Sequence, residues 1–211
     1  MDRESREGRA EHDHGEERDH DEEHGHDEEH GHSEDHAEHD HDEDHEHDHH
    51  AHDVEEVGVA VLTVSSSRSM DDDPAGDAIV ETLEDEGHEV VTRELVPDEY
   101  DRVQGTVDNF IGRDDANVVV TTGGTGVTPD DVTVEAVEPL LNKRLPGFGE
   151  LFRRLSYEEV GSKVIGTCAA AGVTNGTIVF CLPGSESAVR LGVEEIIVEE
   201  AGHLVGLARR D

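Results

Sequence analysis

The amino-acid sequence predicts an α/β fold: a three-layer sandwich with a mostly parallel central sheet, preceded by a disordered tail rich in His, Asp and Glu. From residue 57 onward, short apolar runs alternate with amphipathic segments, the order typical of parallel strands joined by helical crossovers. Polar loops follow these runs, at strand ends where such sheets bind ligands. Residues 1–53 have almost no aliphatic side chains and cannot bury enough surface to offset the entropy of ordering. We therefore expect a tail over 1–53 and one domain over 54–211.

The first half of the domain alternates strand and helix. Residues 57–64 form a continuous apolar run, typical of a strand buried on both faces, and we expect this strand at the centre of the sheet. Pro74 suits the first turn of a helix, and Gly87 ends that helix. The expected strands are 57–64, 88–95 and 117–121, and the expected helices are 74–86 and 97–111.

The second half contains a hairpin signal. Asn175-Gly176 lies between two apolar runs, a pattern typical of a tight turn that adds an antiparallel strand. Pro146 and Gly147 interrupt the chain before a second helical pattern. The expected elements are helices over 132–141 and 150–160, a strand over 163–167, the hairpin within 172–181, and a C-terminal helix from residue 188.

The net charge is −39, from 55 acidic and 16 basic side chains. Such acidity argues against nucleic acid or an anionic membrane as partner, because both attract Lys and Arg. The only lysines are Lys143 and Lys163, and an acidic, lysine-poor chain suggests a halophilic cytoplasm, where salt screens self-repulsion. The chain has no apolar leader or membrane-length run, and Cys168 and Cys181 are expected to be reduced and buried. We expect a cytoplasmic protein.

The tail holds 15 of the 17 histidines. Neutral imidazoles at close spacing beside carboxylates are suitable ligands for Ni²⁺ or Zn²⁺. The spacing is not the fixed, sparse pattern of a structural site, so binding is expected to be multiple, weak and unselective. A merely solvated acidic extension is the equal alternative. The candidate tail ligands are His45, His47, His49 and His50.

A glycine-rich stretch, Thr121-Thr-Gly-Gly-Thr-Gly126, follows the apolar run 117–121. Glycine permits positive φ, so that several backbone N–H groups can converge on a phosphate. Asp131 follows, and a phosphate cradle with a carboxylate at its edge suits metal-assisted phosphoryl chemistry. A plain glycine turn with Asp131 capping the next helix fits the spacing equally well.

A second small-residue loop, Leu182-Pro-Gly-Ser-Glu-Ser187, precedes the C-terminal helix. Its serines either cap that helix or bind an anion, and capping is the favoured interpretation.

The glycine-rich stretch is followed by Asp131-Val-Thr-Val-Glu-Ala136, then by Pro146-Gly-Phe-Gly-Glu150 with Arg153, and then by Leu182-Pro-Gly-Ser185. Together these four blocks resemble the MoaB/MogA family of molybdenum-cofactor biosynthesis proteins, which have the molybdopterin-binding fold. The likeness runs from about residue 57 to the C-terminus.

The resemblance implies Mg-ATP-dependent adenylylation of molybdopterin with release of pyrophosphate. Asp98 and Asp131 match the family's critical aspartates and would also hold Mg²⁺; for Asp98 the alternative is an N-cap. The serines Ser65, Ser66 and Ser67 match the nucleotide-side loop. The residues implied to bind molybdopterin and phosphate are Thr122, Gly123, Gly124, Thr125, Gly126, Thr167 and Ser185.

The resemblance also implies partners: molybdopterin, ATP, copies of the same chain in a trimer or hexamer, and a downstream metal-insertion protein. Phe148, Phe152 and Leu155 are the side chains expected to face a neighbouring copy. Two alternatives are a non-catalytic molybdopterin-binding module and a metal-handling protein that uses the tail. One departure stands out, since Cys168 occupies a position where family members often carry Arg.

Overall fold

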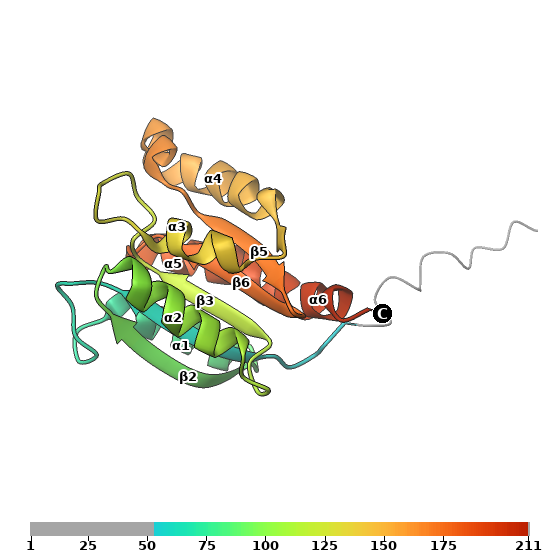
Figure 1. Ribbon diagram of the computed structural model, residues 1–211. Helices are drawn as coiled ribbons and strands as arrows, with labels where there is room; N and C mark the ends of the chain where they lie inside the picture. The colour runs from blue at the N-terminus through green and yellow to red at the C-terminus, as the bar shows by residue number, and fades with distance from the viewer. Residues whose placement is uncertain (1–52, 211) are drawn as a thin grey trace, which may run out of the picture. The chain divides into compact units, whose positions relative to one another are not determined.

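The computed structural model describes residues 53–210, which form a six-stranded sheet with helices on both faces (Figure 1). The strand order is β2-β1-β3-β6-β5-β4. Strands β2, β1, β3 and β6 pair in parallel, whereas β5 and β4 are antiparallel additions at one edge. The predicted mostly parallel sheet is therefore confirmed. Its strands are β1 (Gly58–Val64), β2 (Glu89–Val96), β3 (Val118–Thr122), β4 (Lys143–Arg144), β5 (Ala170–Thr174) and β6 (Thr177–Leu182).

The helices form the two outer layers of the predicted sandwich. One apolar core lies between the sheet and α1, α4, α5 and α6, and a second lies between the sheet and α2 and α3. The α-helices are α1 (Pro74–Asp85), α2 (Tyr100–Ile111), α3 (Thr133–Val137), α4 (Pro146–Val160), α5 (Glu186–Gly192) and α6 (Val198–Ala208). Two 3₁₀ segments, η1 (Glu138–Leu140) and η2 (Gly161–Gly166), and a π-helical segment, η3 (Val193–Ile197), complete the set.

Strand β1 is not at the centre of the sheet as expected but lies between the edge strand β2 and β3, and both of its faces are covered. Val59 and Val61 belong to the first core, and Ala60 and Leu62 belong to the second. All four side chains are fully buried, which explains why this strand has an unbroken apolar run instead of an alternating one. The same holds for β3, whose five residues are all buried. Along β1 and β3 both faces of the sheet are therefore covered, and only the strand ends are left to contact solvent.

The predicted strand over 163–167 is wrong, because this segment is the 3₁₀ helix η2. Ile165 is 83% exposed, so the apolar residues here are not packed into the sheet. The hairpin prediction is confirmed, since β5 and β6 are joined at Asn175-Gly176, both at positive φ. Helix α4 begins at Pro146, four residues earlier than expected, because proline at a first helical position loses no hydrogen bond.

Two expectations about buried and exposed side chains need correction. Cys181 is buried as expected, but Cys168 is exposed. Phe148 and Phe152 do not face outward toward a neighbouring copy: both are core residues, and the ring centroid of Phe148 lies 5.1 Å from that of Phe180. Leu155, the third residue of that set, is partly buried against the same core.

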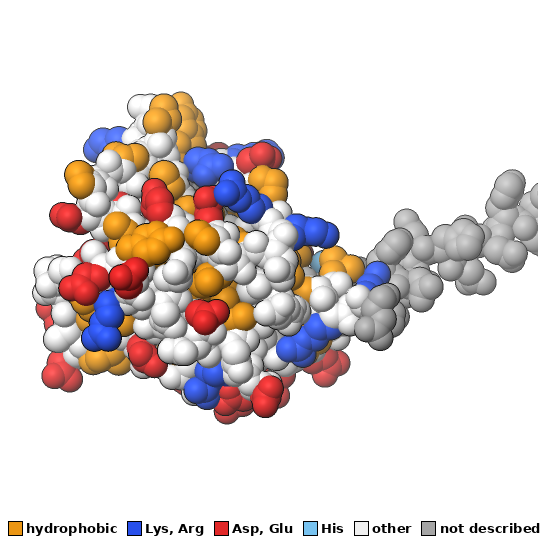
Figure 2. All heavy atoms as spheres, in the orientation of Figure 1, with side chains coloured by type: hydrophobic (Ala, Val, Ile, Leu, Met, Phe, Trp, Pro, Cys, Tyr) orange, Lys and Arg blue, Asp and Glu red, His pale blue; other side chains and the backbone are white. Residues whose placement is uncertain are grey.

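Charged side chains of both signs are interspersed with hydrophobic ones on the face shown in Figure 2. Exposed apolar side chains include Leu151, Tyr157 and Val160 of α4. Among the described helices, none has both the length and the apolar character that crossing a membrane requires.

Candidate functional site

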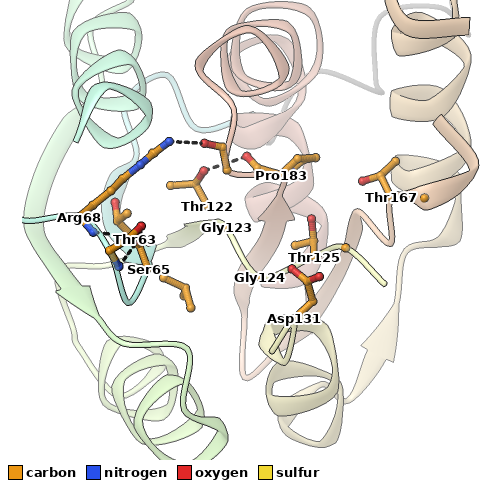
Figure 3. Close-up of a pocket in the computed structure, with 15 residues that line it drawn as sticks. Thr63, Ser65, Arg68, Thr122, Gly123, Gly124, Thr125, Asp131, Thr167 and Pro183 are labelled. Atoms are coloured by element: carbon orange, nitrogen blue, oxygen red, sulfur yellow. Dashed lines mark hydrogen bonds between the residues drawn. The ribbon is translucent and has the colours of Figure 1, made fainter. Parts of the chain in front are cut away.

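The main cleft, of about 400 Å³, opens at the carboxyl ends of β1 and β3 (Figure 3). From β1 the chain turns first to β2 on one side and later to β3 on the other, so this is the point where the strand order reverses. Open α/β sheets bind ligands in the crevice at such a point. The cleft is lined by Thr63, Val64, Ser65, Ser67, Arg68, Thr122, Gly123, Gly124, Thr125, Gly126, Asp131, Gly166, Thr167, Pro183 and Gly184.

The loop after β3 needs glycine at two positions. Gly123 has φ +96° and Gly124 has φ +64°, in the left-handed region. A Cβ on Gly123 would lie 2.2 Å from the carbonyl oxygen of Val64, and one on Gly124 would lie 2.4 Å from Oγ1 of Thr133. The glycines therefore let the end of β3 approach both β1 and α3 closely enough to form the floor of the cleft.

The amide N–H groups of this loop are not equivalent. Gly123 donates its N–H to the carbonyl of Leu182 (3.0 Å), and the Gly126 amide faces the carboxylate of Asp131. Among the described residues, no acceptor receives the N–H of Gly124 or of Thr125. Two successive unpaired amides at the floor of a cleft are suited to an anion. The sequence predicted a cradle over 123–126, and the structure leaves its middle two amides available.

Asp131 borders the cleft beside this loop. Its Oδ2 accepts hydrogen bonds from the N–H (2.8 Å) and the hydroxyl (2.7 Å) of Thr128. Burial acts to raise the pKa of Asp131, but the hydrogen bonds from Thr128 and Gly126 outweigh burial and lower the pKa below its ordinary value. The carboxylate is therefore ionised at neutral pH. Asp131 does not cap α3, whose N-cap is Val132, so the capping interpretation is wrong.

Asp98 is not among the residues that line the cleft; it lies on the loop that follows β2. Its Oδ2 accepts the N–H of Ser66 (2.6 Å), and its own N–H donates to the hydroxyl of Ser66 (3.1 Å). It does not cap α2, whose N-cap is Glu99. Asp98 and Asp131 are therefore not brought together in the lining: Asp98 instead fixes the loop whose Ser65 and Ser67 do line the cleft.

The serine loop after β1 is also held by its own hydroxyl. Oγ of Ser65 accepts the N–H groups of Ser67 (3.3 Å) and Arg68 (3.2 Å), and the N–H of Ser65 donates to the carbonyl of Val96 (2.9 Å). Of the three expected nucleotide-side serines, Ser65 and Ser67 line the cleft and Ser66 faces Asp98. The loop is a fixed wall, opposite the glycine loop.

Arg68 is a charged cleft residue that was not predicted from the sequence. It is the only basic side chain among the lining residues, and it extends toward the loop after β6 (Figure 3). Its Nη2 donates to the carbonyl of Gly184 (3.1 Å). Its Nη1 lies 3.6 Å from Oδ1 of Asp73. The sequence did contain a signal for a phosphate-binding residue here: an arginine directly follows the serines of a loop at a strand end, and guanidinium groups bind phosphate well.

A buried carboxylate, Asp73, holds this arginine and was also missed. Its side chain is fully buried, and Oδ2 accepts the hydroxyl of Thr63 (2.6 Å) and Nη2 of Arg93 (2.8 Å). Oδ1 accepts the N–H of Gly76 (3.1 Å), so Asp73 caps α1. Burial acts to raise the pKa of Asp73, but these hydrogen bonds outweigh burial and lower it. Asp73 thus joins β1, β2 and α1 through charged hydrogen bonds, next to the lining residues Thr63 and Arg68.

The remaining predicted residues are divided between two places. Thr122, the three glycines, Thr125 and Thr167 line the cleft as expected, and the hydroxyl of Thr122 donates to the carbonyl of Pro183 (2.9 Å). Ser185 lies outside this lining; its Oγ accepts the N–H of Ala188 (3.3 Å), which confirms the capping interpretation.

Within residues 53–210 no three His, Cys, Asp or Glu side chains gather closely enough to hold a metal ion by themselves. The candidate tail ligands His45, His47, His49 and His50 lie outside the described residues.

Comparison with known proteins decides the family. Residues 60–203 match the family described as "Probable molybdopterin binding domain". A relative from Bacillus subtilis (strain 168), named "Molybdenum cofactor biosynthesis protein B", is 43% identical over 152 residues, covering 72% of this chain and 89% of the relative. The chain belongs to the MoaB/MogA family. A second relative, from Bacillus anthracis and with the same name, is 42% identical over 150 residues, covering 71% of this chain and 89% of that one.

Solved structures of the MoaB/MogA family share the fold described above. A crystal structure of "Molybdenum cofactor biosynthesis protein B" has a TM-score of 0.72 at 40% identity and covers 74% of this chain and 98% of the other. The tungsten cofactor synthesizing protein MoaB from Pyrococcus furiosus has a TM-score of 0.66 at 39% identity, covering 74% and 99%. The part of the chain that these MoaB proteins share is the part that carries the cleft.

Proposed function

We propose that this MoaB/MogA-family protein adenylylates molybdopterin: a phosphate oxygen of molybdopterin attacks the α-phosphorus of ATP, and pyrophosphate leaves. Relatives named for molybdenum cofactor biosynthesis cover most of the chain, which supports a role in that biosynthesis. The adenylylation step is supported by one observation above all. The amides of Gly124 and Thr125, the guanidinium of Arg68 and the ionised carboxylate of Asp131 border a single cleft at the strand ends.

The balance of the step determines what the cleft must supply. A P–O bond forms between the molybdopterin phosphate and the α-phosphorus, and the bond from that phosphorus to the β-phosphate oxygen breaks, with its electron pair departing on pyrophosphate. Two phosphate groups repel each other, so neutralisation and alignment are the main requirements. In our proposal the amides of Gly124 and Thr125 and the guanidinium of Arg68 donate to phosphate oxygens. These three donors keep their positions without ligand because the backbone and Asp73 hold them.

Mg²⁺ fits the residues present. Protein Mg²⁺ sites use one or two carboxylates, several waters and the phosphates of the substrate, not a complete protein cage. Asp131, in the lining and ionised, is the residue that would hold the ion. The ion would supply charge neutralisation between the two phosphates. Asp98 acts differently in this proposal, because it positions the serine loop that forms the nucleotide side.

The test is pyrophosphate release with molybdopterin and Mg-ATP in molar KCl, comparing Asp131→Asn with Asp130→Asn. Asp130 is the exposed neighbour of Asp131 and does not line the cleft, so it provides a matched control. Losing the metal-holding carboxylate removes several kcal/mol of transition-state stabilisation, so we expect a decrease of about 100-fold for Asp131→Asn. The control should stay within about twofold of wild type. Equal rates in the two variants would contradict the role of Asp131.

A second candidate function is a non-catalytic molybdopterin-binding module. It is favoured by the position of Asp98, whose carboxylate is bound to Ser66 and so leaves one carboxylate in the lining. The same assay separates the two. Saturable molybdopterin binding by the wild-type protein without pyrophosphate release would identify the module.

A further inference from the structure

A histidine–carboxylate pair lies where the histidine-rich tail meets the domain. His203, on α6, is partly exposed, and its Nδ1 lies 2.8 Å from Oδ1 of Asp53. Asp53 is the first described residue, and it directly follows His52 in the chain. The pair therefore belongs to the folded domain but adjoins a segment in which histidines are concentrated.

The start of the domain is fixed on α6 beside this pair. The N–H of Val54 donates to the carbonyl of Gly202 (3.2 Å), and the side chain of Val54 packs against the first apolar core. A Cβ on Gly202 would lie 2.2 Å from the carbonyl oxygen of Val54, so only glycine allows this close approach. Figure 1 shows the cyan segment before β1 running to α6. Asp53 is thus held in place beside His203.

The pair has the geometry of a metal ligand with its supporting carboxylate. A histidine that binds a metal commonly donates its other ring N–H to a carboxylate, which sets the tautomer and the orientation of the ring. With the proton on Nδ1 toward Asp53, the lone pair of His203 lies on Nε2, the nitrogen that would bind the ion. The described residues contain no cluster of three such ligands, so further ligands would have to come from the preceding residues.

Three histidines are near this position by chain length alone. His52 is bonded directly to Asp53, and His50 and His49 precede it closely. A chain spans at most about 3.6 Å per residue, so the Cα of His49 lies within about 14 Å of the Cα of Asp53. Two of these imidazoles together with His203 would supply the three nitrogen ligands of a Zn²⁺ site, and water would supply the fourth ligand.

We infer that His203 and the histidines just before Asp53 form one site for Zn²⁺ or a similar transition-metal ion on α6. Imidazole nitrogen suits Zn²⁺, Co²⁺ and Ni²⁺, whereas Mg²⁺ prefers oxygen. The site differs from the weak, multiple binding expected of the tail, because Asp53 orients one ligand before the ion arrives. It is independent of the proposed function. Asp53 precedes β1 and so lies at the amino end of that strand, whereas the cleft opens at the carboxyl end.

Thermal unfolding of the full chain with increasing free Zn²⁺ separates this site from the rest of the tail. Ligands that come from the tail alone are present in the folded and the unfolded chain, so their binding does not shift the melting temperature. A site that joins the tail to α6 exists only in the folded state. At a free Zn²⁺ concentration about 30 times the dissociation constant of the site, the melting temperature should rise by about 5 °C.

His203→Ala is the test variant and His12→Ala its matched control, because each removes one imidazole and His12 is far from Asp53 in the chain. The control should keep the wild-type rise, and His203→Ala should lose most of it. The quantity compared is the rise with Zn²⁺ in each variant, so a change in stability without metal does not affect the result. If His203→Ala does not fold, His203→Gln replaces it, because glutamine still donates a hydrogen bond to Asp53 but lacks the imidazole.

Two further variants test the supporting groups. Asp53→Asn keeps an acceptor for His203 but removes the charge, and it should weaken Zn²⁺ binding about 10-fold. Replacing His49, His50 and His52 together by Ala should abolish the rise, although the other tail histidines remain. Wild-type Zn²⁺ affinity in either variant would overturn the inference.

Three results with the main variants would also overturn it: no rise in the wild type, an equal rise in His203→Ala, or an equal rise with Mg²⁺. The last would show a general effect of cations on an acidic chain. Failure of the proposed function looks different, because pyrophosphate release would then be absent while His203→Ala still loses the rise with Zn²⁺. If both proposals hold, His203→Ala releases pyrophosphate at the wild-type rate.

Discussion

Replacing Asp73 by Asn will destabilise the protein by about 3 kcal/mol, although the two side chains have almost the same size and shape. Asn keeps one oxygen that can accept the N–H of Gly76, and it still caps a helix well. Its amide nitrogen cannot accept from Thr63 or Arg93, which both donate to Oδ2 in the wild type. Hydrogen bonds to a charged group contribute about 1.5–3 kcal/mol each. The expected loss lies at the lower end of the sum because Arg93 keeps Asp77 at 2.7 Å.

Asp77→Asn is the matched control for this prediction. Asp77 also pairs with Arg93, but its side chain is 65% exposed, so this pair is screened by water and should contribute about 0.5 kcal/mol or less. Urea unfolding measures both variants, because urea is uncharged and the experiment can be repeated at low and at molar KCl. The Asp73 effect should persist at high salt, since buried pairs are screened little. An Asp73→Asn variant within about 0.5 kcal/mol of wild type would refute the reasoning.

The effect of Asp73→Asn should also depend on pH with a definite sign. The folded protein lowers the pKa of Asp73, so the folded state favours the ionised form. The contribution to stability is therefore complete above the unfolded-state pKa of about 3.9 and is lost as pH falls through the lower folded-state value. Wild type and Asp73→Asn should converge in stability on acidification below about pH 4. A difference that grows on acidification would contradict an ionised Asp73.

Four other outcomes are expected. Arg68→Ala should lower kcat/KM for pyrophosphate release about 100-fold with little change in melting temperature, and Arg68→Lys should recover part of the loss, because lysine supplies charge without the planar fork. Gly124→Ala should lose about 2 kcal/mol in urea unfolding, since its φ is +64° and a Cβ would lie 2.4 Å from Thr133, whereas Gly147→Ala, with open space around it, should be close to neutral. A thermal melt should fall when KCl is lowered from molar to millimolar, and an unchanged melt would count against salt adaptation. Equilibrium dialysis with nickel should show more uptake by the full chain than by residues 53–211, and equal uptake would exclude metal buffering by the tail.

The sheet and its turns could be predicted because their signals are local. A strand buried on both faces must be apolar throughout, and β1 and β3 are. The turn at Asn175-Gly176 and the loop at Gly123-Gly124 require positive φ, which glycine and asparagine tolerate. The strand predicted over 163–167 was wrong for the converse reason, because a short apolar run does not show whether that segment packs into the sheet. In the structure the segment is the 3₁₀ helix η2, and Ile165 is exposed.

The cleft shows where local information ends. The sequence by itself determined the fold class, the glycine floor of the cleft and one acidic residue beside it. These features depend on the backbone conformations that nearby residues allow and on the spacing of apolar residues, and both can be read from short stretches of sequence. Only the tertiary structure decided that Asp98 binds Ser66, that Arg68 reaches Gly184, and that Asp73 pairs with Arg68. Arg68 and Gly184 are 116 residues apart in the chain and meet because β6 lies beside β3 in the sheet. Strand order and register set such partnerships, and no pattern of neighbouring residues specifies them.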